Sequence, residues 1–282
     1  MTTVRDALLA IAQAFESKNF SDPKIQAENF LIELFRGSRA DLYQKMNENL
    51  QDFEEVKISA WLEKRLKGEP LAYISEVVEF YGCQLKVNSS VLIPRQETEI
   101  LVDIISRELK GYDLRGKVLW DICCGSGAIG IALKKSFPDL QVSLSDISEE
   151  ALKVARENAH LNHVTVECLK GDLLAPFQGE KADFIVCNPP YISQVEYDQL
   201  DREVKLYEPQ IALVGGSTGL EIYERLSREL PLYLNGQAKV WFEIGYRQGK
   251  RVNELFEDSY WVKKYFENDW AGLNRFFFLE NE

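Results

Sequence analysis

The 282-residue sequence predicts an α/β fold, in which a seven-stranded, mostly parallel sheet carries helices on both faces and follows a small helical bundle. From residue 117 onward, short apolar runs typical of strands alternate with helical segments. In residues 1–75, apolar residues recur at helical spacing. Between these regions, residues 76–94 alternate around turn signals, which predicts a β-hairpin that joins the two units.

Composition narrows the class of protein. Hydrophobic residues make up 45% of the chain, enough for one large core or two ordinary ones. The net charge of −12 argues against a broad nucleic-acid-binding face, although a local basic patch stays open. No run approaches the roughly 18 apolar residues of a membrane helix. The N-terminus also lacks the basic and apolar regions of a secretory signal, so we expect a cytoplasmic protein that binds no membrane.

The sequence offers few metal ligands. It has two histidines and five cysteines, and none of the cysteines forms a C-x-x-C pair. Adjacent Cys123 and Cys124 have poor geometry for sharing a metal. We expect reduced cysteines that act as small core hydrophobes, no bound metal, and no mechanism that rests on a histidine triad.

Four helices are expected in residues 1–75. A capping side chain marks two of the starts, Asp22 before Pro23 and Ser38, and Gly68 follows the last helix. The apolar residues assigned to the fourth helix, 52–67, are Phe53, Val56, Trp61, Leu62 and Leu66. A small bundle beside a catalytic domain either recognises a partner or braces the fold, and we favour recognition.

A charged cluster, Arg95-Gln96-Glu97-Thr98-Glu99, opens a helix expected over residues 95–110. Thr98 or the carboxylates lie near the positive end of the helix dipole. Such a cluster normally only caps a helix. Because it follows the stiff Ile93-Pro94 pair directly, a role in lining a pocket stays open for it.

The region after residue 117 is divided as follows. Strands are expected over 117–122, 141–145, 165–169, 183–187, 238–244, 261–267 and 275–279. Helices are expected over 128–137, 149–160, 220–230 and 248–256. This alternation is typical of a parallel sheet.

A glycine-rich loop, Cys123-Cys124-Gly125-Ser126-Gly127, follows the first of these strands. Glycines let the chain turn tightly and let a ligand approach the backbone. The next strand ends at Asp146, where a carboxylate can accept both hydroxyls of a ribose. With Gly130, the loop satisfies the G-x-G-x-x-G fingerprint of dinucleotide sites. NAD and S-adenosylmethionine are therefore both candidate ligands.

Two features favour S-adenosylmethionine over NAD. Asp121 precedes the loop, where it can meet the cationic amino end of a methionine moiety but would repel a pyrophosphate. A polar motif also follows the fourth strand, at the sheet edge where ligands bind in open α/β sheets. After the third strand, Asp172 offers a carboxylate for an adenine amino group, and Leu173 offers an apolar side chain for its face.

That polar motif is Asn188-Pro189-Pro190-Tyr191. Its prolines stiffen the backbone and lack N–H donors, so carbonyls there are free to face a ligand. We expect a planar substrate bearing an NH2 group to stack on Tyr191. Its two N–H bonds would be accepted by the Asn188 side chain and the Pro189 carbonyl. The alternative interpretation is a chain reversal without function.

Taken together, these residues resemble the release factor glutamine methyltransferases of the PrmC/HemK type, within the class I S-adenosylmethionine-dependent methyltransferases. The resemblance covers essentially the whole chain and rests on several independent stretches. They are Gly68-Glu69-Pro70-Leu71-Ala72-Tyr73-Ile74, Val91-Leu92-Ile93-Pro94-Arg95-Gln96-Glu97-Thr98-Glu99, the glycine loop, Asn188-Pro189-Pro190-Tyr191-Ile192, Tyr207-Glu208-Pro209, Leu213-Val214-Gly215-Gly216, Gly219-Leu220, Glu243-Ile244-Gly245-Tyr246-Arg247-Gln248-Gly249 and Asp269-Trp270-Ala271-Gly272. Two positions depart from the family pattern: Cys123 replaces the first glycine of the loop, and Gln96 stands where the family typically has a second proline.

The resemblance implies a Rossmann-like methyltransferase domain over 95–282, a hairpin linker over 76–94, and an N-terminal domain, 1–75, that docks a class I peptide chain release factor. The implied reaction belongs to translation termination. It transfers methyl from S-adenosylmethionine, leaving S-adenosylhomocysteine, to the glutamine amide nitrogen of the Gly-Gly-Gln motif. The implied enzyme is a metal-free, cytoplasmic monomer that does not bind nucleic acid directly.

Position and resemblance together assign the site residues. The predicted cofactor site comprises Asp121, Cys123, Cys124, Gly125, Ser126, Gly127, Asp146, Asp172, Leu173 and Asn188. The predicted catalytic residues are Asn188, Pro189 and Tyr191. The predicted substrate site comprises Asn188, Pro189, Pro190, Tyr191, Arg95 and Glu97.

Three competing functions stay in view. An NAD dehydrogenase would need an acid/base residue near the nicotinamide, and the sequence offers no good candidate. A nucleic-acid methyltransferase acting on adenine or guanine amino groups shares the chemistry, but it would have to extrude or splay out its base, and the chain shows no basic domain to hold the strand. A non-catalytic binding protein would leave Asn188 and Tyr191 idle.

Overall fold

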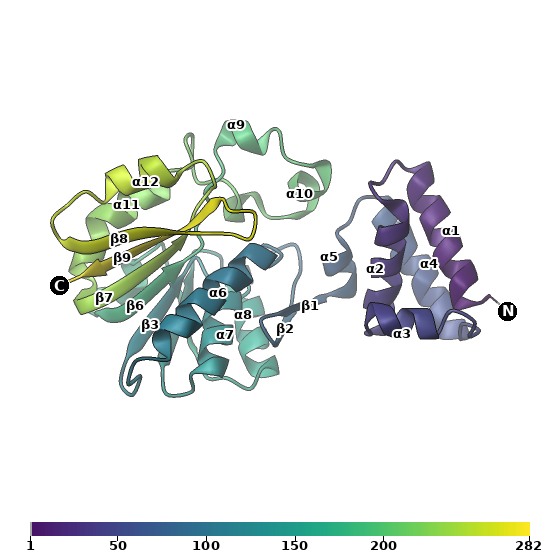
Figure 1. Ribbon diagram of the computed structural model, residues 1–282, viewed down its shortest axis with the longest axis horizontal. Helices are drawn as coiled ribbons and strands as arrows, with labels where there is room; N and C mark the ends of the chain where they lie inside the picture. Colours follow the sequence, from purple (N-terminus) through teal and green to yellow (C-terminus); the bar gives the residue numbers. More distant parts are fainter. Residues whose placement is uncertain (1) are drawn as a thin grey trace. The chain divides into compact units, whose positions relative to one another are not determined.

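The computed structural model describes residues 2–282, so Met1, the first residue of the predicted helical domain, lies outside the described residues. The chain divides into two compact units, Met1–Glu76 and Val77–Glu282 (Figure 1). Each unit encloses hydrophobic clusters of its own.

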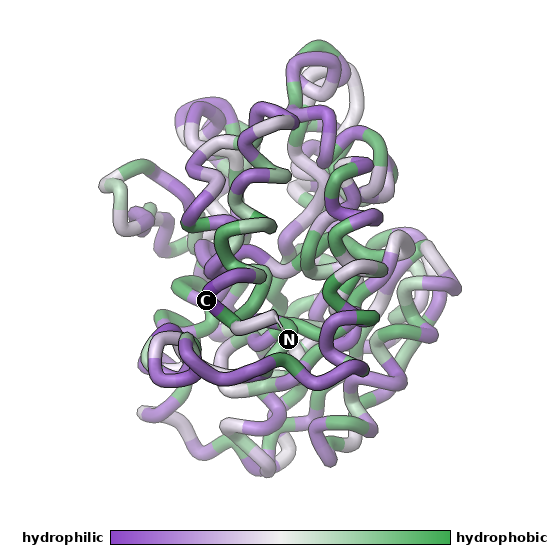
Figure 2. The backbone as a smooth tube through the Cα atoms, turned by 90° about the vertical axis from the view of Figure 1, so that its right-hand side faces the viewer, coloured by the Kyte–Doolittle hydropathy of each residue, from purple (hydrophilic) through white to green (hydrophobic). Residues whose placement is uncertain are grey.

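The first unit is helical, as predicted. Its helices are α1 (Val4–Ser17), α2 (Pro23–Phe35), α3 (Arg39–Gln44), α4 (Asp52–Leu66) and the short α5 (Leu71–Ser75), of which α5 was not expected. Hydrophobic and hydrophilic segments alternate along them (Figure 2). Phe30 lies at the centre of their core, with its ring edge-on to Phe15 and Trp61 at centroid distances of 6.2 and 5.9 Å. These helices therefore bury one apolar stripe each.

Two local predictions in this unit are wrong. Helix α2 begins at Pro23, but the Asp22 side chain makes no capping hydrogen bond, because its backbone is left-handed (φ 45°) rather than extended. Helix α4 packs through Ile58 and Trp61, whereas Phe53 and Val56 are 68% and 70% exposed. Those two residues lie outside the stripe that faces the core.

The predicted hairpin forms from β1 (Val77–Phe80) and β2 (Cys83–Lys86), which pair antiparallel. It belongs to the second unit, where two asparagines at the carboxyl end of α8 (Glu149–Leu161) hold its second strand. Asn158 Oδ1 accepts the Lys86 N–H at 2.6 Å, and Asn162 Oδ1 accepts the Gln84 N–H at 3.2 Å.

All seven predicted strands form one sheet, in the order β5-β4-β3-β6-β7-β9-β8. The strands are β3 (Val118–Ile122), β4 (Gln141–Asp146), β5 (Glu167–Lys170), β6 (Ala182–Cys187), β7 (Leu234–Glu243), β8 (Trp261–Asn268) and β9 (Asn274–Asn281). The first five strands in this order are parallel, and β9 runs antiparallel to both β7 and β8. The sheet is therefore mostly parallel, as predicted.

Helices cover both faces of this sheet (Figure 1). One face carries α6 (Gln96–Leu109), α7 (Ala128–Ser136) and α8; the other carries α11 (Glu221–Glu229) and α12 (Gly249–Leu255). Adjacent strand residues point to opposite faces, so Phe184 joins the first cluster and Ile185 the second. Burial on both faces explains why the central strands β3 and β6 are nearly continuous apolar runs.

Short elements fill the connections. They are η1 (Ala175–Phe177), α9 (Gln194–Tyr197), α10 (Arg202–Tyr207), η2 (Gln210–Ala212) and η3 (Leu230–Leu232). Helices α9 and α10 and the turn η2 follow β6, in a segment to which the sequence assigned no element. None of the helices within residues 2–282 combines the length and apolar character needed to cross a membrane.

Candidate active site

A cavity of about 230 Å³ lies at the carboxyl ends of β3, β4 and β6. Most of the predicted site residues line it: Asp121, Cys123, Cys124, Gly125, Ser126, Asp146, Asp172, Leu173, Asn188 and Pro190. Five others, Arg95, Glu97, Gly127, Pro189 and Tyr191, are not among the described residues of its lining. The sheet topology thus brings the glycine loop and Asn188 to one cavity, although 60 or so positions separate them in sequence.

The loop after β3 turns through left-handed backbone at Cys123 (φ 58°), Gly125 (φ 53°) and Gly127 (φ 78°). Glycine adopts this conformation without steric cost. A Cβ atom at Gly127 would lie 2.8 Å from Ile131 Cδ1, so this glycine is also needed for packing. Cys123, the departure from the family pattern, is the residue of the three that carries a side chain in a strained conformation.

Asp121 is the most deeply buried acid of the cavity. It is 1% exposed, and its Oδ2 accepts the Gly130 N–H at 2.8 Å. Its Oδ1 and the Ser145 Oγ, which also lies on the cavity lining, have no hydrogen-bond partner among the described residues. Burial raises the pKa of Asp121 to about 7. Unpaired buried polar atoms are rare, and two of them on one cavity indicate a polar ligand.

The Asp146 carboxylate links the glycine-rich loop to the start of α8. Its Oδ2 accepts the Gly125 N–H at 2.8 Å, and its Oδ1 accepts the Ser148 N–H at 2.9 Å, just before α8. Burial raises the pKa of this carboxyl as well. Each carboxylate oxygen keeps a second lone pair for a hydroxyl donor.

Asp172 has an unpredicted partner. Arg225 of α11 lines the same cavity and holds both carboxylate oxygens of Asp172, each at 3.0 Å. The pair is half-exposed. The fork geometry of arginine explains the two-point contact.

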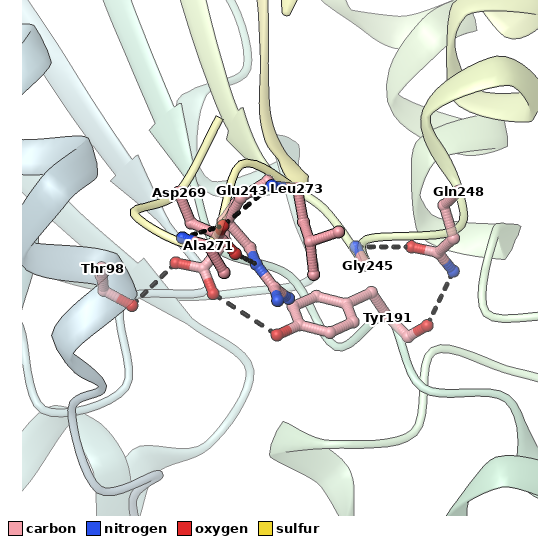
Figure 3. A network of polar contacts seen from close by, with 9 residues as sticks. Thr98, Tyr191, Glu243, Gly245, Gln248, Asp269, Ala271 and Leu273 are labelled. Carbon is pink, nitrogen blue, oxygen red and sulfur yellow. Dashed lines mark hydrogen bonds and ion pairs between the residues drawn. The ribbon is translucent and has the colours of Figure 1, made fainter. Parts of the chain in front are cut away.

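Asn188, which is half-buried, belongs to a chain of polar contacts that reaches Glu243 at the end of β7. Figure 3 shows the part of this chain formed by Thr98, Glu243 and Tyr191. Asn188 Nδ2 donates to Thr98 Oγ1 at 3.4 Å, and Thr98 Oγ1 donates to Glu243 Oε2 at 2.7 Å. The Tyr191 hydroxyl donates to Glu243 Oε1 at 3.4 Å. None of the described side chains caps α6. The Thr98 hydroxyl is bound to the end of β7 instead, and Thr98 lines the cavity, the role that the sequence left open for its cluster.

The backbone after Asn188 is held by residues far along the chain. Gln248 Nε2 donates to the Tyr191 carbonyl at 2.8 Å, and Gln248 Oε1 accepts the Gly245 N–H at 2.9 Å (Figure 3). Ile192 pairs with Val214 in an isolated parallel bridge. A Cβ atom at Gly219 would lie 2.2 Å from the Tyr191 carbonyl oxygen. Several of the sequence stretches that carried the resemblance thus contact the same short backbone segment, Tyr191 and Ile192.

Arg95 does not line the cavity, and its guanidinium is held in an ion pair. Its Nη2 donates to Glu208 Oε1 at 2.6 Å, and the other carboxylate oxygen accepts the Ile93 N–H at 3.3 Å. Glu208 is buried. This ion pair joins the segment before α6 to the Tyr207-Glu208-Pro209 stretch.

Sequence reasoning left a pocket-lining role open for the cluster that contains Thr98, but it gave no role to Glu243, Ser145, Arg225 or Gln248. A signal was available for Glu243, since it is a polar residue at the carboxyl end of a buried parallel strand. The same position had singled out Asn188 on β6.

Similarity to known proteins agrees with this geometry. Residues 6–75 match the model of the PrmC N-terminal domain, and residues 96–204 match that of the methyltransferase small domain. The chain is 42% identical to the release factor glutamine methyltransferase of Chlamydia trachomatis serovar L2 over 270 residues, 94% of this chain and 90% of the relative. The chain belongs to the release factor glutamine methyltransferase family. The family member from Bacillus cereus is 37% identical and covers 88% of this chain and 89% of its own length.

Solved methyltransferases share the fold of this family member. A methyltransferase from Pyrococcus furiosus superposes with a TM-score of 0.51 at 19% identity, over 79% of this chain and 98% of its own. The 16S rRNA methyltransferase RsmC of Thermus thermophilus gives 0.53 at 15% identity, over 73% of this chain and 50% of its own. Within residues 2–282, no three His, Cys, Asp or Glu side chains are arranged to hold a metal ion.

Proposed function

We propose that this chain transfers a methyl group from S-adenosylmethionine to the side-chain amide nitrogen of the glutamine in the Gly-Gly-Gln motif of class I peptide chain release factors. The observation that carries the proposal is that Asn188 and the glycine loop line one cavity. The 42% identity to a protein named release factor glutamine methyltransferase supports this substrate over a nucleic-acid base.

The residues of the cavity fit S-adenosylmethionine, whose sulfonium supplies an activated methyl group. The unpaired Asp121 Oδ1 suits the cationic amino end, and Asp146 has free lone pairs for the ribose hydroxyls. Leu173 offers an apolar face for adenine, and the backbone of residues 123–127 turns in a conformation that a ligand can approach closely. Asp172 would accept the adenine amino group beside its contact with Arg225.

The acceptor residues must overcome the poor nucleophilicity of an amide nitrogen, whose lone pair is delocalised into the carbonyl. The rotation barrier of roughly 18–20 kcal/mol shows the strength of that conjugation. Asn188 Oδ1 and the Pro189 carbonyl would accept the two N–H bonds, which aims the nitrogen and helps it pyramidalise. The Tyr191 ring would hold the amide plane. Orientation of this kind can supply about 7–11 kcal/mol.

The proposal extends to the rest of the chain. The helices of residues 1–75 would dock the release factor, and Arg95 and Glu97 would contact it next to the cavity. The protein would act in the cytoplasm as a monomer, which light scattering of the purified chain would check.

The experiment is transfer of labelled methyl from S-adenosylmethionine to a purified release factor, beside the same factor with its Gly-Gly-Gln glutamine replaced. Label on the first and none on the second is the expected result. Equal label on both would show that the target residue is wrong. Label only on added RNA or DNA would show that the Asn-Pro-Pro-Tyr motif binds a base.

A further inference from the structure

Glu243 is a buried carboxylate at the point where β7 meets the acceptor side of the cavity. It is 2% exposed, and its two oxygens contact two different hydroxyl groups, those of Thr98 and Tyr191 (Figure 3). Its backbone is fixed independently, because the Tyr223 hydroxyl donates to the Glu243 carbonyl at 2.8 Å. A carboxylate in this position costs solvation energy that a neutral side chain would not. That cost calls for an explanation beyond filling space.

The direction of the hydrogen bonds around Thr98 explains why a carboxylate is buried here. A threonine hydroxyl has a single proton, and Thr98 gives it to Glu243 at 2.7 Å. Toward Asn188, Thr98 Oγ1 can then only accept. The side-chain atom of Asn188 that faces Thr98 must therefore be the donor Nδ2, which is the 3.4 Å contact observed. The short bond to the carboxylate thus decides the orientation of the asparagine amide.

We propose that Thr98 and Glu243 are positioning residues that fix the side-chain amide of Asn188, so that its Oδ1, and not its NH2 group, faces the methyl acceptor. The inference rests on the acceptor role that the proposed function gives Asn188. A flipped amide would present donors to a substrate NH2 group that itself can only donate.

The charged and polar groups around Glu243 determine the pKa of its carboxyl group, and the hydrogen bonds to Thr98 and Asn188 depend on whether that group is ionised. Arg275 stabilises the carboxylate, Glu97 opposes it, and the Thr98 and Tyr191 hydroxyls hydrogen-bond to it. Arg275 is itself paired with Asp269 at 3.3 Å. Burial dominates and raises the pKa of Glu243 to about 7. Once protonated, the carboxyl group of Glu243 can donate a hydrogen bond to Thr98 Oγ1. The Thr98 hydroxyl can then turn and donate its own hydrogen bond to Asn188. The flipped amide is then favoured, so turnover should fall below about pH 7.

The test compares Thr98→Val, which removes the hydroxyl at constant shape, with Thr98→Ser, which keeps it. We expect Thr98→Val to lower kcat about 10- to 100-fold, the scale of a misplaced catalytic group, with little change in the Kd of S-adenosylmethionine by calorimetry. Thr98→Ser should restore most of kcat. Wild-type kcat in Thr98→Val would overturn the inference, and so would equal losses in the two variants.

Glu108→Gln is the matched control. Glu108 lies at the other end of α6 and also joins it to β7, through Lys239 and the Trp241 Nε1–H at 3.0 Å. Glu108 is not part of the hydrogen-bonded set of Asn188, Thr98, Glu243 and Tyr191. We expect this variant to lower Tm without lowering kcat, whereas Glu243→Gln should lower kcat and, at saturating S-adenosylmethionine, weaken the pH dependence of kcat near 7. Equal kcat in Glu108→Gln and Glu243→Gln would overturn the inference.

A measurement that does not depend on methyl transfer tests this inference separately from the proposed function. The side-chain NH2 resonances of Asn188, assigned by their loss in Asn188→Asp, should be protected from solvent exchange in the wild type and in Thr98→Ser, and unprotected in Thr98→Val. Protection that persists in Thr98→Val would overturn the inference even if the release factor is methylated. Loss of protection would support it even if the methyl acceptor proves to be a base.

Discussion

Charged side chains form ion pairs near the amino ends of the central strands, whereas buried carboxyl groups near the carboxyl ends have no hydrogen-bonded cation. Toward the amino ends, Lys117 pairs with Asp183 at 2.8 Å, and Lys239 bridges Glu108 and Glu280. At the carboxyl ends, Asp121 and Glu243 are buried without a hydrogen-bonded cation, and the pKa of each is raised to about 7 by burial. The first arrangement satisfies its charges within the fold. The second leaves two buried carboxyl groups without a hydrogen-bonded cation and leaves Asp121 Oδ1 free to bind a ligand, which is the expected mark of a functional site.

The largest effect should come from Asn188→Ala at the carboxyl edge. Removal of the acceptor for a substrate N–H should cut kcat about 100- to 1,000-fold, as loss of one oriented hydrogen-bonding group does in other enzymes. The Kd of S-adenosylmethionine, followed by calorimetry, should change far less. Unchanged methyl transfer would sink the role of Asn188 and, with it, the contrast between the two ends.

Asp121→Asn should separate binding from stability. Loss of a charge-assisted contact costs about 1.5–3 kcal/mol, so the Kd of S-adenosylmethionine should rise about 10- to 100-fold. The same change removes a buried charge, so Tm of the ligand-free protein at pH 8 should not fall. If Tm drops together with the affinity, Asp121 serves the fold in the same way as the paired acids at the amino ends.

The stability of the ligand-free protein should fall as pH rises toward 7. The pKa values of Asp121 and Glu243 lie above their ordinary values of 3.8 and 4.5. Over that window the folded protein binds more protons than the unfolded chain, so the free energy of unfolding decreases with pH and levels off above about 7. Denaturant titrations across this range should show the slope, and the double variant Asp121→Asn/Glu243→Gln should flatten it. A flat wild-type curve would contradict the assigned pKa directions.

Lys239→Met tests the amino half of the sheet. Removal of the ammonium leaves Glu108 and Glu280 without their shared partner, and we expect a loss of about 1–3 kcal/mol in unfolding free energy. Methyl transfer at a temperature well below Tm should stay at the wild-type rate. A fall in kcat would mean that the two ends are coupled.

The smallest effect is expected for Cys123→Gly, which restores the family's glycine. The left-handed backbone at φ 58° costs a residue with a side chain about 1 kcal/mol, while glycine adds unfolded-state entropy of similar size. Tm should therefore shift by only a few degrees in either direction. A large loss of stability would show that the Cys123 side chain packs in a way that outweighs its backbone strain.

Sequence reasoning reached the seven strands because the central ones, such as β3 and β6, are buried apolar runs and the others are short segments between turn residues. It reached the cavity because parallel strands end together. It did not place β9 between β7 and β8, since local pattern carries no information on strand order. It also missed the Thr98–Glu243 hydrogen bond, which joins residues 145 positions apart. Pairings of that span depend on how α6 lies across the sheet, and no periodicity reports it.

The long-range contacts at Tyr191 affect the order in which parts of the protein can fold. Gln248, 57 positions later, holds the Tyr191 carbonyl, and β7 is completed by β9 at the very end of the described chain. The backbone at Tyr191 and the end of β7 therefore cannot take their final form until Gln248 and β9 have been made. Long-range closure of this kind is slow. We expect a newly made chain to form the part of its cavity at the ends of β3 and β4 before it forms the part that contains Asn188.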